Sequence, residues 1–505
     1  MARKSSIPEE ILKYRPAPST KVRNDNGIYH VYKYSAKKLK SGKWGTNSGY
    51  LIGKIVPGEG FVANKRYLQE LADEKKVEYS NEITDVQYGK YALLISLSQE
   101  KVLENLKKCF ITERAYQIYA YGLILCANGF IHVDQINDCY LDSYLSLLYS
   151  KFSFKMGYTA LSNLLTEIGR QGNPRNKFEQ LMIDESTKNI ALDGHVIKSY
   201  SWNNCFAEPG YKMKSLKAPQ INIIMAYDIK AKQPLAYQTF RGSSVDKKSC
   251  KDFFKGRTFT NTKFFVDRGF NTKDLLDIMS SNGNTYATPV RSNDKDYTRI
   301  KETLEFDNEF IYKPSKKETA HILYHDEQLD NDVRIIVYKD IDENNSTIKN
   351  YLTMLDLGEN GYTQEILEEK RDWWGVYVLK TNMKESAKEI FEGYKDRWLI
   401  ETYNNYVKND ADFNHLKTQD YYTARGLDFI MLVTGIIHST LNEAVLSLNK
   451  SSISNSDILR KAGHLRMVKN GKKWELRNDR TKDIKLLEQM GFTPLLEYPS
   501  KSAVS

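Results

Sequence analysis

The chain has 505 residues, of which 41% are hydrophobic, and its formal net charge is +10. A chain of this length exceeds what one hydrophobic core usually holds, which excludes a single small domain and predicts roughly two to four domains. The positive charge favours a polyanionic partner, although many basic proteins bind no nucleic acid.

Cysteine usage and apolar stretches bear on the cellular compartment. The five cysteines are odd in number and form no CxxC pair, which argues against a disulfide framework and a structural zinc site. The first ten residues lack the apolar run of a secretory signal. The most apolar stretch, residues 427–448, is interrupted by Asp428, His438 and Glu443, which favours a buried helix over a membrane span. We expect a cytoplasmic protein.

Residues 1–97 are predicted to form a basic, β-rich N-terminal domain. Polar and apolar residues alternate over 28–34, and a second strand is predicted over 50–56. The loop between them carries Lys37, Lys38, Lys40 and Lys43, so the two strands would form a ribbon with a cationic tip. Such a tip could grip DNA phosphates or could be a solvated hairpin, and the sequence does not separate these alternatives.

Residues 98–183 are predicted to be helical, because apolar residues recur there at spacings of three and four. The region could bind DNA, mediate dimerisation or simply pack against the rest of the protein. The predicted helices are Gln99 to Phe110, Glu113 to Ala127, Leu141 to Lys155 and Gly157 to Gln171.

Residues 184–292 are predicted to form the first part of an α/β core. A short apolar strand over 189–193 ends on Asp193, and a second aromatic and β-branched run ends on Asp267. Further strands are predicted over 220–227, 235–240 and 286–291, and helices over 246–254 and 272–281. The resulting order, β-β-β-α-β-α-β, would place the two aspartates on neighbouring strands. Each aspartate alone is more typical of a turn or an N-cap.

Other polar residues near these aspartates are weaker candidates. His195 would share the Asp193 side of the strand, where a histidine is more often a hydrogen-bonded neighbour than a metal ligand. No apolar strand leads into Asp184 or Glu185, and Arg268 would alternate to the face opposite Asp267.

The interval 293–371 is too long for a simple connection and predicts an inserted β-rich subdomain. Strands are predicted over 319–324, 332–338 and 373–379. Trp373 or Trp374 could stack on a displaced base, although core packing is the more frequent role of such residues.

Residues 372–450 would complete the core, with a helix that carries a mixed stripe of charges. At about 100° per residue, Tyr394, Arg397, Glu401 and Lys408 fall within roughly 60° of one another. A chance run of charges on an ordinary amphipathic helix is the alternative. Residues 451–505 form a basic C-terminal region with a predicted hairpin turn at 469–472, which could bind phosphates or be a solvated surface.

Asp193, Asp267 and Glu401 together offer three oxygen ligands for hard divalent cations. The Y-x2-R-x3-E-x6-K signature is present in Tyr394, Arg397, Glu401 and Lys408. With these residues and the two aspartates, the chain resembles over residues 185–450 a DDE transposase of the bacterial insertion-sequence-four superfamily. The resemblance implies an α/β multidomain protein with an RNase H-like mixed sheet flanked by helices. It also implies an inserted β-rich subdomain between the second aspartate and the glutamate.

The resemblance further implies two-metal-ion DNA cleavage and strand transfer by a 3′-hydroxyl. Asp193 would touch two Mg²⁺ ions, for which Mn²⁺ would substitute, while Asp267 and Glu401 would each complete one. Arg397 and Lys408 would bind phosphates beside the scissile bond, and Tyr394 another. The partners would be transposon ends and target DNA at the bacterial nucleoid, with a homodimer in the synaptic complex. The alternatives are a metal-dependent nuclease without strand transfer and a domesticated DNA-binding protein.

Overall fold

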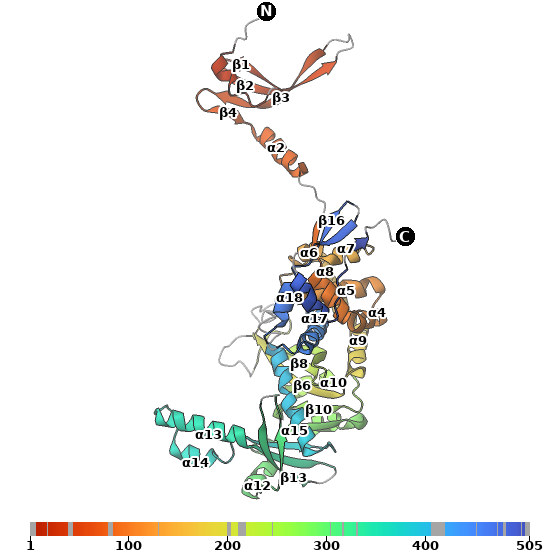
Figure 1. Cartoon of the computed structure of the whole chain (residues 1–505), viewed down its shortest axis with the longest axis vertical. Helices are drawn as coiled ribbons and strands as arrows, with labels where there is room; N and C mark the ends of the chain where they lie inside the picture. Colours follow the sequence, from red (N-terminus) through yellow and green to blue (C-terminus); the bar gives the residue numbers. More distant parts are fainter. Residues whose placement is uncertain are drawn as a thin grey trace, which may run out of the picture. The chain divides into compact units, whose positions relative to one another are not determined.

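The structure is a computed structural model of the whole chain (Figure 1). It describes residues 7–17, 19–38, 44–78, 84–129, 131–198, 204–210, 219–244, 246–303, 305–315, 318–329, 332–405, 420–450, 452–471, 473–477, 481–495 and 497–499.

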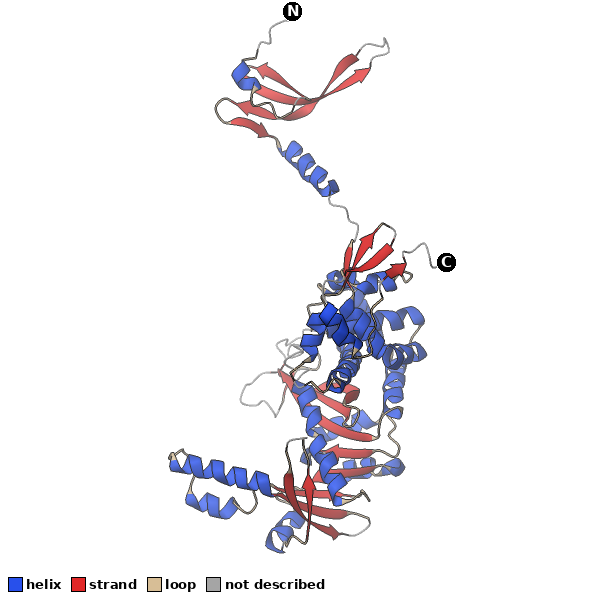
Figure 2. Ribbon diagram, viewed as in Figure 1, coloured by secondary structure: helices blue, strands red, loops and turns tan. Residues whose placement is uncertain are grey.

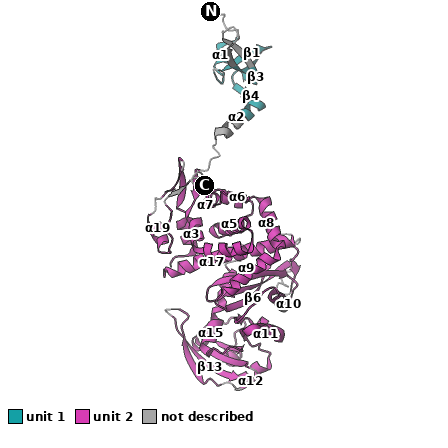
Figure 3. Ribbon diagram, turned by 90° about the vertical axis from the view of Figure 1, so that its right-hand side faces the viewer, with its two compact units in different colours: residues 1–83 teal, residues 84–505 magenta. Residues whose placement is uncertain are grey.

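The chain divides into two compact units, residues 1–83 and 84–505 (Figure 3). The first unit therefore ends before residue 97, where the sequence places the boundary. Within the second unit, one end is largely helical, and the large sheet with its own flanking helices lies at the other (Figure 2).

The first unit is an antiparallel sheet in the order β1-β2-β3-β4. The strands are Thr20–Asp25, Ile28–Lys38, Trp44–Val56 and Gly60–Ala63, and they are flanked by α1 (Glu9–Leu12) and α2 (Lys65–Glu78). Val22, Val31, Ile52 and Ile55 form its small core. The predicted ribbon corresponds to β2 and β3, but Lys40 and Lys43 at its predicted tip lie outside the described residues.

The second unit begins with β5 (Asp85–Gln87) and a helical region. Its helices are α3 (Gly89–Ser98), a π-helical segment (Gln99–Leu103), α4 (Glu104–Cys109), α5 (Thr112–Asn128), α6 (Ile136–Leu141), α7 (Tyr144–Leu148), α8 (Tyr158–Arg170) and α9 (Gly172–Asp184). The predicted helix over 141–155 is too long, because only α7 within this range is helical beyond Leu141. Ser143 is extended and interrupts the helix, and Phe152 and Phe154 stack on each other beyond the end of α7.

The long helix α17 (Tyr421–Ser447) is the centre of the helical region. It packs against α8, α5 and α3 and covers β9 of the sheet. Gly426 lies against the backbone of Leu165, and Gly169 against that of Tyr422, so α8 and α17 approach closely. By length and composition α17 could cross a membrane, but 67% of its most apolar window is buried inside the protein.

The large sheet begins with a core of five principal strands. These are β6 (Asn189–Lys198), β8 (Pro219–Asp228), β9 (Gln233–Arg241), β10 (Lys263–Val266) and β11 (Thr285–Pro289). β6, β8 and β9 form an antiparallel meander, while β10 pairs in parallel with β6, and β11 in parallel with β10. The short β7 (Glu208–Pro209) also pairs with β8. Helices α10 (Asp246–Phe254) and α11 (Lys273–Met279) lie between strands in the predicted chain order.

The interval after β11 extends this sheet. β15 (Val376–Thr381) pairs antiparallel with β11 and continues it into β14 (Arg334–Asp340), β13 (Ala320–Gln328) and β12 (Asn308–Tyr312). The inserted strands therefore share the central sheet, and helices accompany them: α12 (Lys295–Thr303), α13 (Ile341–Asp356) and α14 (Gln364–Lys370). α13 and α14 project from the sheet as a helical hairpin (Figure 1).

The chain continues through α15 (Ala387–Asp396) and α16 (Trp398–Asn405) to α17. Beyond α17 lie α18 (Asn455–Ala462), β16 (Arg466–Asn470), β17 (Lys473–Arg477), α19 (Thr481–Glu488) and β18 (Glu497–Pro499). The strands form a second sheet in the order β18-β17-β16-β5. β16 and β17 make the hairpin that the sequence predicts, although Lys472 in its turn lies outside the described residues.

Candidate active site

The two aspartates lie side by side, with Asp193 on β6 and Asp267 directly after the neighbouring strand β10. Leu192 on β6 is paired with Val266 on β10, so the next residue of each chain segment, Asp193 and Asp267, comes level with the other. β6 continues beyond Asp193, whereas β10 ends just before Asp267. Both aspartates are half-buried. Asp267 also caps the short 3-10 turn that follows, because it accepts a hydrogen bond of 2.7 Å from the Arg268 backbone N–H.

Glu401 lies on α16, the second of two successive helices. α15 begins with a capping box between Ser386 and Glu389 and ends at Asp396, and α16 begins at Trp398. The sequence predicts one continuous helix here, and that prediction is wrong in this respect. The backbone tightens at Arg397, whose N–H bonds to the Tyr394 carbonyl three residues back. Lys408 lies outside the described residues, so its place on the predicted stripe stays a prediction.

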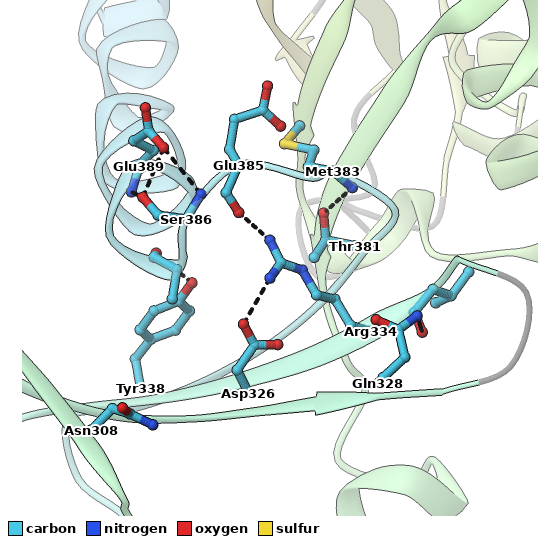
Figure 4. Close-up of polar contacts among 12 residues, drawn as sticks. Asn308, Asp326, Gln328, Arg334, Tyr338, Thr381, Met383, Glu385, Ser386 and Glu389 are labelled. Carbon is cyan, nitrogen blue, oxygen red and sulfur yellow. Dashed lines mark hydrogen bonds and ion pairs between the residues drawn. The ribbon is translucent and has the colours of Figure 1, made fainter.

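The inserted strands hold the beginning of α15 (Figure 4). Arg334 on β14 donates to Asp326 on β13 at 2.7 Å and also to the Glu385 carbonyl, just ahead of the helix. The Tyr338 hydroxyl donates to the Ala387 carbonyl at 2.7 Å. Lys263 on β10 pairs with the Glu385 carboxylate at 2.5 Å. The start of the helix that leads to Glu401 is therefore tied both to the inserted strands and to β10, the strand that ends just before Asp267.

Two glycines let the glutamate helices approach their supports. Gly393 on α15 lies against the Phe265 ring on β10, where an added Cβ would clash with the ring. Gly435 on α17 lies closer still to the Tyr403 hydroxyl on α16. Tyr403 also packs against Tyr227 on β8, with ring centroids 5.4 Å apart. Phe265 precedes Asp267 by two residues, so the α15 contact and the second aspartate share one strand end.

The cation and the acid of the predicted stripe pair with each other. Arg397 donates to Glu401 at 2.8 Å, and its guanidinium lies 5.6 Å from the Tyr394 ring centroid. The Arg397 side chain is only 14% exposed, while that of Glu401 is 53% exposed. Among the described residues, the buried Nε of Arg397 has no hydrogen-bond partner. The structure thus brings Tyr394, Arg397 and Glu401 together as neighbours.

Asn404 is a site residue that the sequence analysis missed. It lies on α16, three residues after Glu401, and its Nδ2 donates to Asp193 Oδ2 at 2.7 Å. Asn404 is only 4% exposed, whereas the adjacent Asn405 is exposed. Nothing in the residue type distinguishes the two asparagines, so the sequence held no signal for this contact.

The electrostatics of Asp193 link the three carboxylates. Burial raises the pKa of Asp193, and the negative charges of Glu401 and Asp267 raise it further. The Arg397 charge and the Gly194 backbone N–H act in the opposite direction and only partly offset the rise. Asp193 therefore responds to both other carboxylates, and an additional cation beside it would stabilise its ionised form.

The donor set suits a hard divalent cation in its chemistry, because it consists of carboxylate oxygens and a buried amide. As the side chains stand, no three His, Cys, Asp or Glu side chains in the described part of the chain lie close enough together to hold an ion. Glu401 is instead paired with Arg397. Joint coordination requires the three carboxylates to converge further than they do here.

The weaker candidates have local roles. Glu185 accepts from Asn105 at 3.0 Å, and Asp184 accepts from Gln180 at 2.9 Å. His195 is buried in β6 and Arg268 is exposed. Trp373 packs against Tyr297, with ring centroids 5.8 Å apart, and Trp374 against Tyr351 at 5.0 Å.

Fold and site together define a mixed α/β protein in which a central sheet and two short helices bring acidic side chains near one another. Residues 185–435 match the family model of the transposase DDE domain, which spans both aspartates and Glu401. This part of the chain is therefore a transposase DDE domain.

One solved structure is similar over much of the chain. It is described as the cryo-EM structure of a piggyBac transposase synaptic complex with hairpin DNA, with 14% identity and a TM-score of 0.39 over 74% of this chain and 79% of that chain. A likeness of this degree establishes neither fold nor function. No curated protein matches the chain.

Proposed function

We propose that the protein is the transposase of an insertion sequence of the insertion-sequence-four superfamily, and that it cuts and joins DNA at the ends of its element. The transposase DDE domain over residues 185–435 is the observation that carries this proposal. The spacing of the superfamily signature is present in Tyr394, Arg397 and Glu401. Arg397 lies against the Tyr394 ring and pairs with Glu401. The strand order β9-β8-β6-β10-β11, with β10 and β11 parallel to β6, is that of an RNase H-like sheet and supports the proposed core.

In this proposal Asp193, Asp267 and Glu401 would together hold two Mg²⁺ ions. When bound, such ions activate a nucleophile and stabilise charge on the phosphoryl and leaving oxygens. Asp193 would serve both ions, because its pKa responds to the charges of both other carboxylates. Burial and like charge disfavour its ionised form in the metal-free protein, so binding a cation there would relieve an existing repulsion.

Arg397 and Tyr394 would position the DNA strand beside the carboxylates. Arg397 is held in place by its pair with Glu401 and by the Tyr394 ring, and its planar guanidinium has the donor geometry that suits a phosphate. Lys408 would add a second phosphate contact. The Arg397 and Glu401 pair would loosen when a phosphate and metal ions replace the two partners. We further propose that two copies pair the ends of the element at the bacterial nucleoid.

The experiment that tests this function is incubation of the full chain with a labelled duplex that carries the element's end, with Mg²⁺ or Mn²⁺, beside the Glu401→Gln variant. We expect metal-dependent nicking at the end and joined products from the wild type, and a loss of about 100-fold or more in the variant, because a ligand matters more than the residues that support it. DNA binding should persist in the variant.

Cleavage without joined products would favour a metal-dependent nuclease. DNA binding without cleavage in either protein would favour a domesticated DNA-binding protein, and the transposase proposal would then fail. Equal cleavage by both proteins would remove Glu401 from the site.

A further inference from the structure

Asn404 contains a buried polar atom without a partner. Its Nδ2 donates a hydrogen bond to Asp193 Oδ2. Its Oδ1 is buried and, among the described residues, makes no hydrogen bond. A buried acceptor left unsatisfied costs about 1–3 kcal/mol, so such an atom calls for an explanation.

The orientation of the amide follows from its neighbour. An ionised carboxylate only accepts hydrogen bonds, so the side of Asn404 that faces ionised Asp193 must be the NH₂ group. The carbonyl oxygen is then the end that stays available. Because a side-chain amide is short and planar, this buried oxygen lies close to the Asp193 carboxylate that the same amide contacts.

The position on α16 places Asn404 beside the other carboxylate as well. Residues three apart lie on the same side of a helix, so Asn404 and Glu401 are neighbours on α16. The helix packs onto β6, which carries Asp193. Ile400 and Tyr403, which also lie on α16, are buried and apolar or aromatic, so packing alone would favour an apolar residue at 404. The amide at this point instead makes a hydrogen bond with the Asp193 carboxylate.

We propose that Asn404 is a positioning residue of the metal site. Its NH₂ group holds Asp193 in one orientation, and its Oδ1 accepts a hydrogen bond from a water molecule on the divalent ion that Asp193 binds. This inference rests on the proposed function, since it assumes that Asp193 is a metal ligand. Hydrogen-bond partners of this kind orient ligands and waters and typically change metal affinity by about 10–100-fold when they are removed.

The test is a titration of the full-length protein with Mn²⁺ in the absence of DNA. The concentration of free Mn²⁺ is measured by electron paramagnetic resonance. The variants are Asn404→Leu, which keeps the volume and removes both hydrogen-bonding groups, and Asn404→Ala. Asn405→Ala is the matched control, because Asn405 is the next residue of the same helix and is exposed. Titrations are made well below the melting temperature of each variant, so that unfolding does not contribute.

We expect the Kd for Mn²⁺ to rise by about 10–100-fold in both Asn404 variants and to stay unchanged in Asn405→Ala. The Mg²⁺ concentration for half-maximal cleavage should rise in parallel, while the Kd for DNA in EDTA stays the same. If Asn404 had a purely structural role, its replacement would not weaken metal binding selectively. DNA affinity would then not stay unchanged while metal affinity falls.

The Asp193→Asn variant separates the two levels of the claim. If the wild type binds Mn²⁺ and Asp193→Asn does not, the metal site stands, and wild-type affinity in both Asn404 variants would then overturn the role of Asn404 alone. If Asp193→Asn binds Mn²⁺ as well as the wild type does, the proposed function itself loses its metal ligand and the inference falls with it.

Discussion

At the scale of single residues, the site contains an ion pair between a buried cation and an exposed carboxylate. Arg397 is largely buried yet charged, and its partner Glu401 is the most exposed of the three carboxylates. A buried cation needs such a partner, because leaving it unpaired is costly. The same pair keeps Glu401 occupied while no other cation is present.

The Arg397→Gln variant tests this competition between cation and metal. Removing the guanidinium frees Glu401 and makes the surroundings of Asp193 more negative, so the Mn²⁺ affinity of the DNA-free protein should stay equal or rise. Cleavage should nevertheless fall by about 10-fold or more, because the DNA strand loses a positioned phosphate contact. Both quantities come from one preparation, by Mn²⁺ titration and a cleavage assay. A variant that loses cleavage and Mn²⁺ affinity together would show that Arg397 supports the metal site and does not compete with it.

How far the site could be predicted differs from residue to residue. The apolar runs before Asp193 and Asp267 could be recognised from sequence periodicity, and in the structure Leu192 on β6 pairs with Val266 on β10 just ahead of them. The predicted strand end at Asp193 is wrong, because β6 continues to Lys198, whereas β10 does end just before Asp267. Asn404 could not be predicted, because only burial separates it from Asn405. The tertiary contacts of α16 with β6 decide which asparagine meets the aspartate.

At the scale of elements, the approach of α15 to β10 sets the position of the glutamate. Gly393 permits this approach because an added Cβ would collide with the Phe265 ring. The helix is fixed at its other end by Tyr338 and by the cap at Ser386. Only a small shift is therefore available to α15 if the glycine is replaced.

The Gly393→Ala variant should lower both stability and cleavage. Alanine favours a helix, but here the overpacked contact should cost about 1–3 kcal/mol and move Arg397 and Glu401 away from the aspartates. We expect a lower melting temperature and a cleavage rate reduced by about 10-fold or more. The control is Gly172→Ala at the start of α9, where the nearest atom to an added Cβ is 3.9 Å away. Wild-type cleavage in Gly393→Ala would contradict the positioning role of this contact.

Some helices and strands could be predicted from sequence patterns, and others could not. The strands of the core and α10 follow clear apolar periodicity and appear in the predicted order. The interruption at Arg397 was not predictable, since the surrounding residues suit a continuous helix and the tight turn forms where two packed helices meet. The predicted strands of the interval correspond to β13, β14 and β15, but β12 was not predicted. The pairing of β14 with β15, and of β15 with β11, depends on long-range contacts that no local pattern records.

At the scale of the whole molecule, a compact N-terminal unit is separate from the unit that holds the site. Residues 1–83 form their own sheet and their own small hydrophobic core. Basic residues outnumber acidic ones in this unit, which suits a contribution to DNA affinity and not to chemistry.

Removal of residues 1–83 should leave the second unit folded while weakening DNA binding. Because fewer phosphates are neutralised, log Kd for the element's end should depend less steeply on log salt concentration. Metal-dependent nicking at saturating DNA should persist, since all described site residues lie in the second unit. A truncated protein with an unchanged salt slope would exclude a phosphate-binding role for the N-terminal unit.

The central claim is that Asp193 binds the catalytic metal ion, and a change of metal preference tests it most directly. The measurement is cleavage by the Asp193→Cys variant in Mg²⁺ and in Mn²⁺, because a thiolate is a poor ligand for Mg²⁺ and a better one for softer ions. The account predicts no detectable cleavage with Mg²⁺ and partial recovery with Mn²⁺, while the wild type cleaves with both. Cleavage by Asp193→Cys at the wild-type rate with Mg²⁺ would contradict the account.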